Sequence, residues 1–350
     1  MIPVLRGLMI GAAGGGLCWL AGIPAPWLAG SMAAAVAAVF AGVKIGMPDW
    51  LRSMAFIFLG IQTGTSVTWD TVERAAQWPL SIAFLGLTVV AVTWAGAFFY
   101  TRYRNWDGAT ALFASLPGAL SLVLLLASET KADMRRVTIA QCIRLFFLVA
   151  ALPLVITALS PHIAAPEAQG SFGGLGQIIV AIVASTAAGL ALERLRVPAG
   201  LILGPVVVAA TLELTGLIHG AAPASVLIPA NIVLGVLIAS RFTGFSFAEF
   251  RQALAEGFSG FLIALGVATA GAAITSAVAG LPFALTLLAF SPGGLDAMTI
   301  MAFALGLDPA YVGAHQIARY VGMALLMPVV TGYILQRMAP ALKDDKWNAS

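Results

Sequence analysis

Two short motifs, one in each half of the chain, place serine, proline and glycine inside long apolar segments. Their residues are Ser115, Pro117, Gly118 and Ser121 in the first half, and Ser291, Pro292, Gly293, Gly294 and Asp296 in the second. Proline lacks a backbone donor and glycine relaxes the chain, so each motif predicts a helix break with free carbonyls. Helix ends of this kind, together with hydroxyl groups, can bind a small solute.

The two motifs differ at one matching position, where the first has Ser121 and the second has Asp296. A carboxylate inside an apolar segment is costly unless it meets a cation, a proton or an arginine. We therefore predict that Asp296 binds a coupling ion or exchanges a proton. The alternative is that Asp296 caps the helix after the Pro-Gly-Gly turn, which does not exclude the functional role.

A glutamine followed three residues later by an arginine lies in the next apolar segment of each half. The pairs are Gln141 with Arg144 and Gln316 with Arg319, and this spacing places each pair on one face of a helix. Each arginine could clamp an anionic substrate or neutralise Asp296, and the alternative is that it extends to the membrane interface. Neighbouring His315 could relay protons, although a polar contact between helices is the favoured interpretation.

The composition predicts an all-α polytopic membrane protein. Of the 350 residues, 60% are hydrophobic and only 9% are charged, so most of the molecular surface must face lipid. The net charge of +3 does not indicate a nucleic-acid partner, because membrane proteins place Lys and Arg according to topology.

The same composition argues against an enzyme. The three histidines, His162, His219 and His315, belong to different segments, and metal-dependent oxidation would need them clustered. No Ser, His and Asp stand at a spacing typical of a hydrolase. Cys18 and Cys142 lie in apolar segments and are interpreted as small core residues. We expect no metal site and no cofactor.

The chain is predicted to contain two copies of one unit, since the motifs share one offset. Leu116-Pro-Gly-Ala-Leu-Ser121 matches Ser291-Pro-Gly-Gly-Leu-Asp296, and the Gln-Arg pairs and Pro153 with Pro328 match at the same 175 residues. Each half has six apolar segments, at about 4–20, 26–43, 50–66, 78–100, 109–127 and 137–159, then 176–193, 199–217, 226–242, 257–279, 283–305 and 311–335. The predicted units are a first membrane repeat at 1–160, a periplasmic linker at 161–175, a second repeat at 176–337 and a cytoplasmic tail at 338–350.

The positions of Lys and Arg predict that the Pro-Gly segments do not cross the membrane. Arg102 and Arg104 precede the first of them and Arg135 and Arg136 follow it, so a crossing would violate the positive-inside rule. A segment that enters and returns on one face removes the conflict. Each half then has five crossings and one re-entrant segment, the repeats are inverted, and both termini are cytoplasmic. The alternative is that both Pro-Gly segments are kinked helices that cross.

These features predict a secondary active transporter, because hairpins from opposite faces meet near the midplane of the bilayer. The matched arginines and exposed helix ends favour a small organic anion, coupled to protons or sodium ions. Lipid surrounds the helices, and a homodimer is compatible with the architecture. The alternative is a membrane-embedded regulator or sensor that affects gene expression indirectly, although no loop is long enough for a soluble output domain.

The paired motifs also resemble a known family. Pro26-Trp-Leu-Ala-Gly30 and Pro198-Ala-Gly-Leu-Ile-Leu-Gly-Pro205, together with the two Pro-Gly motifs, are similar to the AbrB-duplication family of bacterial inner-membrane proteins over essentially the whole chain. Members carry labels such as regulator of gene expression and ammonia monooxygenase. The family is distantly similar to the cation/proton antiporter and anion transporter superfamily. The resemblance implies an inverted-repeat transporter fold with elevator-type motion, but no established substrate.

Overall fold

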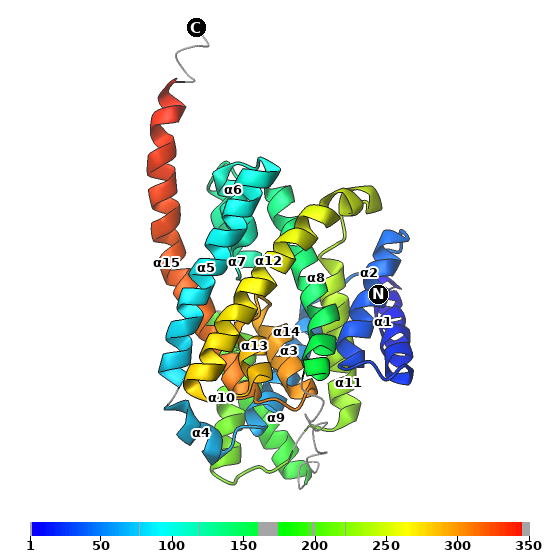
Figure 1. Ribbon diagram of the computed structural model, residues 1–350. Helices are drawn as coiled ribbons and strands as arrows, with labels where there is room; N and C mark the ends of the chain where they lie inside the picture. The colour runs from blue at the N-terminus through cyan, green and yellow to red at the C-terminus, as the bar shows by residue number, and fades with distance from the viewer. Residues whose placement is uncertain are drawn as a thin grey trace.

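The computed structural model describes residues 2–344 except 77, 119, 160–173, 196, 198–199 and 221, and it describes no side chains at 120–122, 175, 296 and 327–344. Within the described residues every regular element is an α-helix (Figure 1). The helices are α1 (Ile2–Leu20), α2 (Pro26–Phe40), α3 (Asp49–Thr65), α4 (Trp69–Ala75), α5 (Trp78–Arg104), α6 (Gly108–Ser115), α7 (Leu120–Ser128), α8 (Met134–Leu159), α9 (Leu175–Arg194), α10 (Gly200–Leu214), α11 (Ala224–Ser240), α12 (Phe247–Ala279), α13 (Phe283–Phe290), α14 (Leu295–Ala304) and α15 (Pro309–Asp344).

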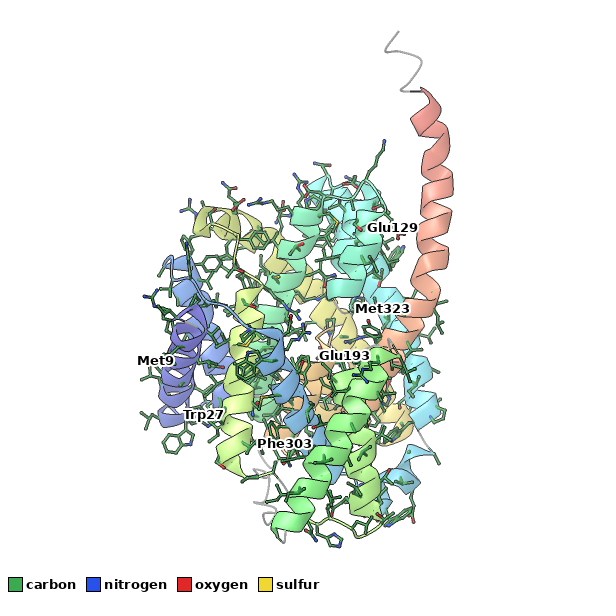
Figure 2. The ribbon with its side chains drawn as sticks, turned by 180° about the vertical axis from the view of Figure 1, so that it is seen from behind. Met9, Trp27, Glu129, Glu193, Phe303 and Met323 are labelled. Atoms are coloured by element: carbon green, nitrogen blue, oxygen red, sulfur yellow. The ribbon has the colours of Figure 1, made fainter. Side chains whose placement is uncertain are left out.

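Several of these helices fit a membrane protein. Five helices in the described part of the chain are long and apolar enough to cross a bilayer, namely Ile2–Leu20, Trp78–Arg104, Met134–Leu159, Gly176–Arg194 and Phe247–Ala279. Large apolar side chains such as Met9 and Trp94 are exposed on them, and Met9 points away from the bundle in Figure 2. The predicted all-helical, apolar architecture is confirmed.

Local signals explain where several helices begin and end. The Asp107 carboxylate accepts a hydrogen bond from the Thr110 amide at the start of α6, at 2.9 Å. Ser246 and Glu249 form a reciprocal capping box at the start of α12, and Gly280 ends that helix with a φ of 65°, a conformation that favours glycine. Short helix α4, capped by Thr68, had not been expected from the sequence.

Each Pro-Gly segment is divided into two helices, α6 and α7 in the first half and α13 and α14 in the second. Leu116 and Ser291, which directly precede the prolines, have extended backbones with ψ of 123° and 133°. A residue before proline is disfavoured in the helical region because of a clash with the proline ring. The helix breaks therefore lie where the sequence placed them.

The first broken segment folds back towards its starting point. The Asp133 amide, beyond α7, donates to the Thr110 hydroxyl near the start of α6 at 2.7 Å. Helices of 8 and 9 residues placed in line would span about 25 Å. The chain from Ser128, where α7 ends, to Asp133 can span at most about 18 Å. That is too short to return from the far end of two collinear helices to Thr110 near the start of α6. Helices α6 and α7 are therefore not collinear.

The helices pack in two groups. The first group, hereafter the outer group, contains α1, α2, α3, α9, α10 and α11, and the second, the core group, contains α5 to α8 and α12 to α15. In the outer group, a Cβ on Gly60 would lie 2.8 Å from the Ile202 carbonyl oxygen, and one on Gly235 would lie 2.8 Å from the Leu28 carbonyl oxygen. Glycine at each crossing therefore lets the two backbones approach closely, and the contact of α3 with α10 is as close as that of α11 with α2.

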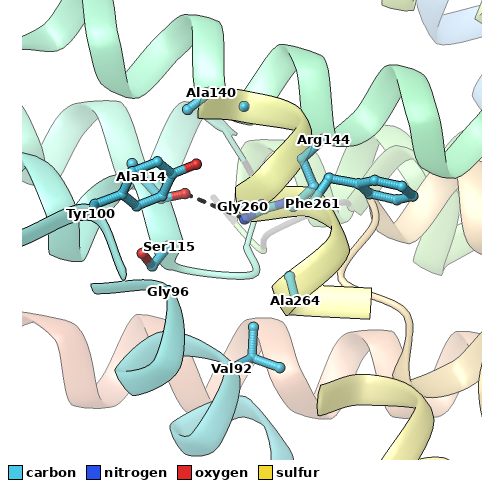
Figure 3. Close-up of a pocket in the computed structure, with 11 residues that line it drawn as sticks. Val92, Gly96, Tyr100, Ala114, Ser115, Ala140, Arg144, Gly260, Phe261 and Ala264 are labelled. Carbon is cyan, nitrogen blue, oxygen red and sulfur yellow. Dashed lines mark hydrogen bonds between the residues drawn. The ribbon is translucent and has the colours of Figure 1, made fainter. Parts of the chain in front are cut away.

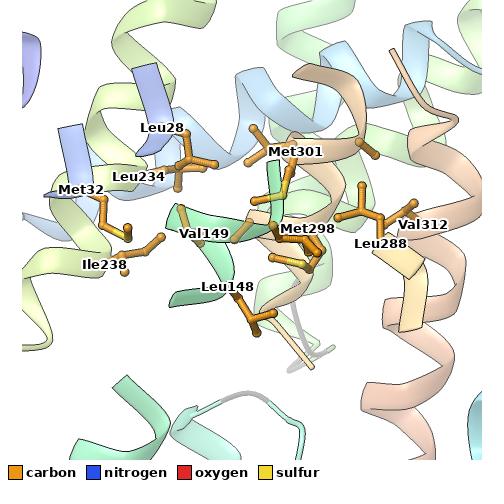
Figure 4. Close-up of a cluster of buried hydrophobic side chains, with 14 of the residues drawn as sticks. Leu28, Met32, Leu148, Val149, Leu234, Ile238, Leu288, Met298, Met301 and Val312 are labelled. Carbon is orange, nitrogen blue, oxygen red and sulfur yellow. The ribbon is translucent and has the colours of Figure 1, made fainter. Parts of the chain in front are cut away.

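The two groups share the largest apolar cluster of the molecule (Figure 4). Leu28 and Leu234 enter it from the outer group, and Leu148, Met298 and Val312 enter it from the core group. In the core group, α5 and α12 are antiparallel, since Tyr100 packs on Gly260 and Thr88 on Gly271.

We predict that Gly64→Ala and Gly204→Ala destabilise the fold, because a Cβ would lie 2.5 Å from the Val206 carbonyl oxygen or the Gly189 nitrogen. The expected loss is about 1–3 kcal/mol each, typical of overpacking. Thermal unfolding in detergent measures it. Gly86→Ala in α5 is the control, since no atom lies within 4 Å of its added Cβ; an equal loss in all three variants would contradict the close-packing argument.

Candidate functional site

A cavity of about 480 Å³ lies between the outer group and the tips of the two broken segments. It is lined by residues of both groups: Arg52, Phe56, Gly118, Leu124, Gln141, Cys142, Arg144, Leu145, Ile202, Leu237, Arg241, Pro292, Gly293, Gly294, Leu295, Gln316, Arg319 and Tyr320. Its volume falls within the range of small-molecule sites. It is therefore the candidate functional site.

The first helix break is held by Gln141 and Arg144 of α8. The Gln141 amide donates to the carbonyls of Phe113 and Leu116, at 2.8 and 3.0 Å. The Arg144 guanidinium donates to Leu116 O at 3.0 Å and to the side-chain oxygen of Gln141. Carbonyls at a helix end have no partner within their own helix, so these two side chains replace the bonds that the break removes.

The second break is held in the same way by Gln316 and Arg319 of α15. Gln316 donates to Ala289 O at 3.1 Å, and Arg319 donates to Ser291 O at 2.7 Å. Arg319 also donates to Gly293 O and to the Gln316 side chain. Arg144 and Arg319 are each only 6% exposed, so neither extends to a membrane interface, and the matched pairs hold matched breaks.

The cavity has a strongly positive lining. Four arginines line it, Arg52, Arg144, Arg241 and Arg319, and no Asp or Glu is among the lining residues whose side chains the structure describes. The bonds of Arg144 and Arg319 go to neutral carbonyls and amides, which do not cancel a full charge. The Nε atoms of Arg52 and Arg144 are buried without a hydrogen-bond partner. Because charges interact strongly in a low-dielectric site, the cavity suits an anion.

Eight of the residues predicted from sequence line this cavity: Gly118, Gln141, Arg144, Pro292, Gly293, Gly294, Gln316 and Arg319. The serines do not. The Ser115 hydroxyl donates to Ala111 O and the Ser291 hydroxyl to Leu287 O, each at 2.7 Å within its own helix. Pro117 is buried at the break and does not line the cavity.

Ser115 instead faces a second, much smaller space. This pocket of about 10 Å³ lies between α5, α6, α8 and α12, where Ser115 packs near Gly96 and Tyr100 (Figure 3). A water needs roughly this volume, so no larger solute fits. Arg144 reaches both spaces.

His315 forms a contact between helices and does not line the cavity. Its Nε2 lies 2.7 Å from the Ser81 hydroxyl of α5, and its Nδ1 lies 2.8 Å from Tyr311 O. The ring packs 3.9 Å from that of Tyr311 and is fully buried. The interpretation as a polar interhelix contact fits this geometry.

The side chains of Ser121 and Asp296 lie outside the described residues. The backbone places Asp296 second in α14, directly after Leu295 of the cavity lining. Most of the predicted linker at 161–175 and the end of the tail also lie outside the described residues. Among the described residues, no three His, Cys, Asp or Glu side chains are grouped so that they could hold a metal ion.

Two of the lining arginines are not among the site residues predicted from the sequence, although the polar end of the span that contains Arg241 left a cavity lining and a helix end at the headgroups as alternatives. Arg52 stands near the start of α3 and Arg241 caps the end of α11, where basic residues usually only mark a cytoplasmic boundary. No motif distinguishes them. Their shared role follows from the packing of α3 and α11 beside the core group.

Comparisons with known proteins identify relatives over nearly the full length. The family model described as "Transition state regulatory protein AbrB" matches residues 27–335. The chain is 27% identical to "Putative regulator AbrB" of Escherichia coli (strain K12) over 322 residues, 89% of this chain and 90% of that protein. It is 23% identical to "Uncharacterized protein YhjN" of Bacillus subtilis (strain 168) over 347 residues, 92% of this chain and 90% of that protein.

We predict that Gln316→Met destabilises the protein by about 1–3 kcal/mol, the typical cost of unpaired buried polar groups. The change removes the donor to Ala289 O and the acceptor of Arg319. Thermal unfolding in detergent measures the loss. Asn231→Leu is the control, because Asn231 donates only to Leu227 O of its own helix. Equal melting temperatures for the two variants would contradict the proposed support of the break.

Proposed function

The chain belongs to the family described as transition state regulatory protein AbrB, and we propose that it is a secondary active transporter of a small organic anion in the bacterial inner membrane. The observation that carries this proposal is the cavity of about 480 Å³ with four lining arginines and no acid among the lining side chains that the structure describes. Its position at the tips of two broken helices matches the way transporters build solute sites from discontinuous helices.

The proposal includes two inverted repeats, and the directions of the broken segments support them. Helix α6 follows the end of α5, near the start of α12, as Tyr100 and Gly260 indicate. Helix α13 follows the opposite end of α12, where the Thr286 hydroxyl donates to Ala272 O at 3.1 Å. In Figure 1, α6 lies at the top of the bundle and α13 in its lower half. These positions support the proposal that the tips approach the cavity from opposite faces, as two re-entrant hairpins would.

We propose elevator-type movement of the core group against the outer group. Both helix breaks and their Gln-Arg pairs belong to the core group, so the tips and the bound solute can move together. The outer group supplies Arg52, Ile202 and Arg241 to the other wall of the cavity. Movement along this boundary would change which face the cavity reaches, which is what alternating access requires.

Asp296 is proposed to couple transport to a proton or sodium gradient. It is the second residue of α14, at the tip of the second broken segment, and the first repeat has Ser121 at the matching position. A carboxylate in such an apolar region needs a cation or a proton. Binding and release of that cation would link the gradient to the state of the tip.

The printed name of the Escherichia coli relative supports a second candidate, a membrane-embedded regulator without transport. The described residues form a single helical assembly with no separate folded output domain. An effect on transcription would then be indirect, for instance through solute concentration. We favour transport rather than catalysis or direct regulation, because the arginine-lined cavity suits solute binding.

Inverted repeats predict that the two broken segments enter from opposite faces. In a Cys18→Ala, Cys142→Ala background, the Glu129→Cys variant beside the first segment should react with a membrane-impermeant maleimide only from the cytoplasm. The Pro282→Cys variant beside the second should react only from the periplasm. Both residues are exposed. Labelling of both variants from the same face would rule out the inversion.

We predict that proteoliposomes containing the protein accumulate a small carboxylate under an imposed proton or sodium gradient. Asp296→Asn should abolish gradient-driven accumulation while leaving solute exchange without a gradient, because only the coupling carboxylate is lost. Uptake of radiolabelled carboxylates measures both. Glu129→Gln, which removes an exposed carboxylate outside the cavity lining, is the control. Unchanged accumulation in Asp296→Asn would remove Asp296 from the mechanism.

A further inference from the structure

The four arginines of the cavity come from two different structural groups. Arg144 on α8 and Arg319 on α15 belong to the core group and are held by the helix breaks. Arg52 on α3 and Arg241 at the end of α11 belong to the outer group. The cavity therefore has two pairs of guanidinium groups on two walls.

The two arginines of the outer group make fewer hydrogen bonds and ion pairs with the rest of the protein than the two arginines of the core group. Arg52 makes one ion pair, at 3.4 Å, with an Asp49 side chain that is 89% exposed. Its Nε is nevertheless buried without a partner. The Arg241 guanidinium has no hydrogen-bond or ion-pair partner in the described part of the chain. The guanidinium groups of Arg52 and Arg241 therefore keep donors that no described residue accepts.

In the core pair, Arg144 also retains free donor capacity. Arg144 is 6% exposed, and its Nε is buried without a partner although its other nitrogens bind carbonyls. A guanidinium has five N–H donors, so Arg144 can hold the break and still donate to a solute. Gly293 and Gly294 at the start of α14 line the same wall, where the helix dipole also favours negative charge.

Apolar side chains complete the lining beside the two pairs. Phe56, Ile202 and Leu237 come from the outer group, and Leu124, Leu145 and Leu295 come from the core group. A solute that meets both pairs must therefore present acidic groups to the arginines and an apolar surface to these residues.

Resting on the proposed function, we infer that the solute is a dicarboxylate with an apolar spacer, one carboxylate held by each arginine pair. Four buried or half-buried cations line the cavity, and none of the lining residues whose side chains the structure describes is acidic, so the positive charge of this lining is costly to leave uncompensated in a low-dielectric site. A dianion compensates more of it than a monoanion. Arginine suits the task, because its planar fork matches a carboxylate in two parallel hydrogen bonds.

The binding test uses the purified full chain in detergent and a series of straight-chain α,ω-dicarboxylates from succinate to pimelate. Each is compared with the monocarboxylate of equal chain length, and inorganic phosphate serves as a dianion with a single centre. Isothermal titration measures the affinities. We expect one dicarboxylate length to bind at least about tenfold more tightly than its monocarboxylate, as one additional charged hydrogen bond provides. Equal binding, or tightest binding of phosphate, would overturn the inference.

Variants of the outer pair test the two-wall arrangement directly. Arg241→Gln and Arg52→Gln should each weaken dicarboxylate binding by about 10- to 100-fold and change monocarboxylate binding by less than about threefold. Arg251→Gln, which removes an exposed charge of α12 outside the cavity lining, controls for net charge and should change neither. Equal losses for both ligand classes, or no loss, would show that the outer pair does not hold a second carboxylate.

The outcomes separate this inference from the proposed function. One outcome is that the protein takes up monocarboxylates under a gradient, with the same rate in Arg241→Gln. This result would support transport and refute the two-carboxylate site. Selective dicarboxylate binding without uptake of any carboxylate would leave the two-carboxylate site standing and refute transport. Absence of carboxylate binding altogether would refute the inference.

Discussion

The need to pair backbone carbonyls at two helix breaks shapes the centre of this protein. An unpaired carbonyl in an apolar interior costs as much as a lost hydrogen bond. Here Gln141 and Arg144 pair the carbonyls of the first break, and Gln316 and Arg319 pair those of the second. A neutral side chain could supply one or two such bonds, but a guanidinium supplies several in a fixed plane.

The use of arginine at the breaks brings positive charge into the protein interior. Carbonyl dipoles stabilise a guanidinium but do not neutralise it, so the same residues that complete the fold also create an attractive field for an anion. The two breaks meet at one cavity, and Arg52 and Arg241 add further charge from the outer group. Structural support and the proposed solute binding would therefore use the same residues, and substitutions of Arg144 or Arg319 would affect both. Arg52 and Arg241 differ in this respect, because they do not hold a helix break and would take part only in the proposed solute binding.

The packing of the two helix groups fits a second requirement of the proposed transport. Glycines let α3 meet α10, and α11 meet α2, at backbone distance, which makes the outer group a compact unit. The core group carries both breaks. The boundary between the groups is apolar around Met298 and Leu234 and hollow at the arginines. In the proposed transport this boundary would shift as a unit, because few polar bonds between described residues cross it, such as that of Cys142 with Arg241 O.

Much of this architecture could be predicted from the sequence. The helices follow from apolar segments of membrane length, the breaks from Pro117 and Pro292, and the shared helix face of each Gln-Arg pair from the spacing of Gln141 with Arg144 and Gln316 with Arg319. These features are local, since they depend on backbone chemistry within a few turns. The roles of Arg52 and Arg241, the inward bonding of Arg144 and Arg319, and the contact of His315 with Ser81 required the tertiary structure. Each joins residues that are distant in the sequence, and a basic residue near a helix end has the same local pattern whether it faces headgroups or a cavity.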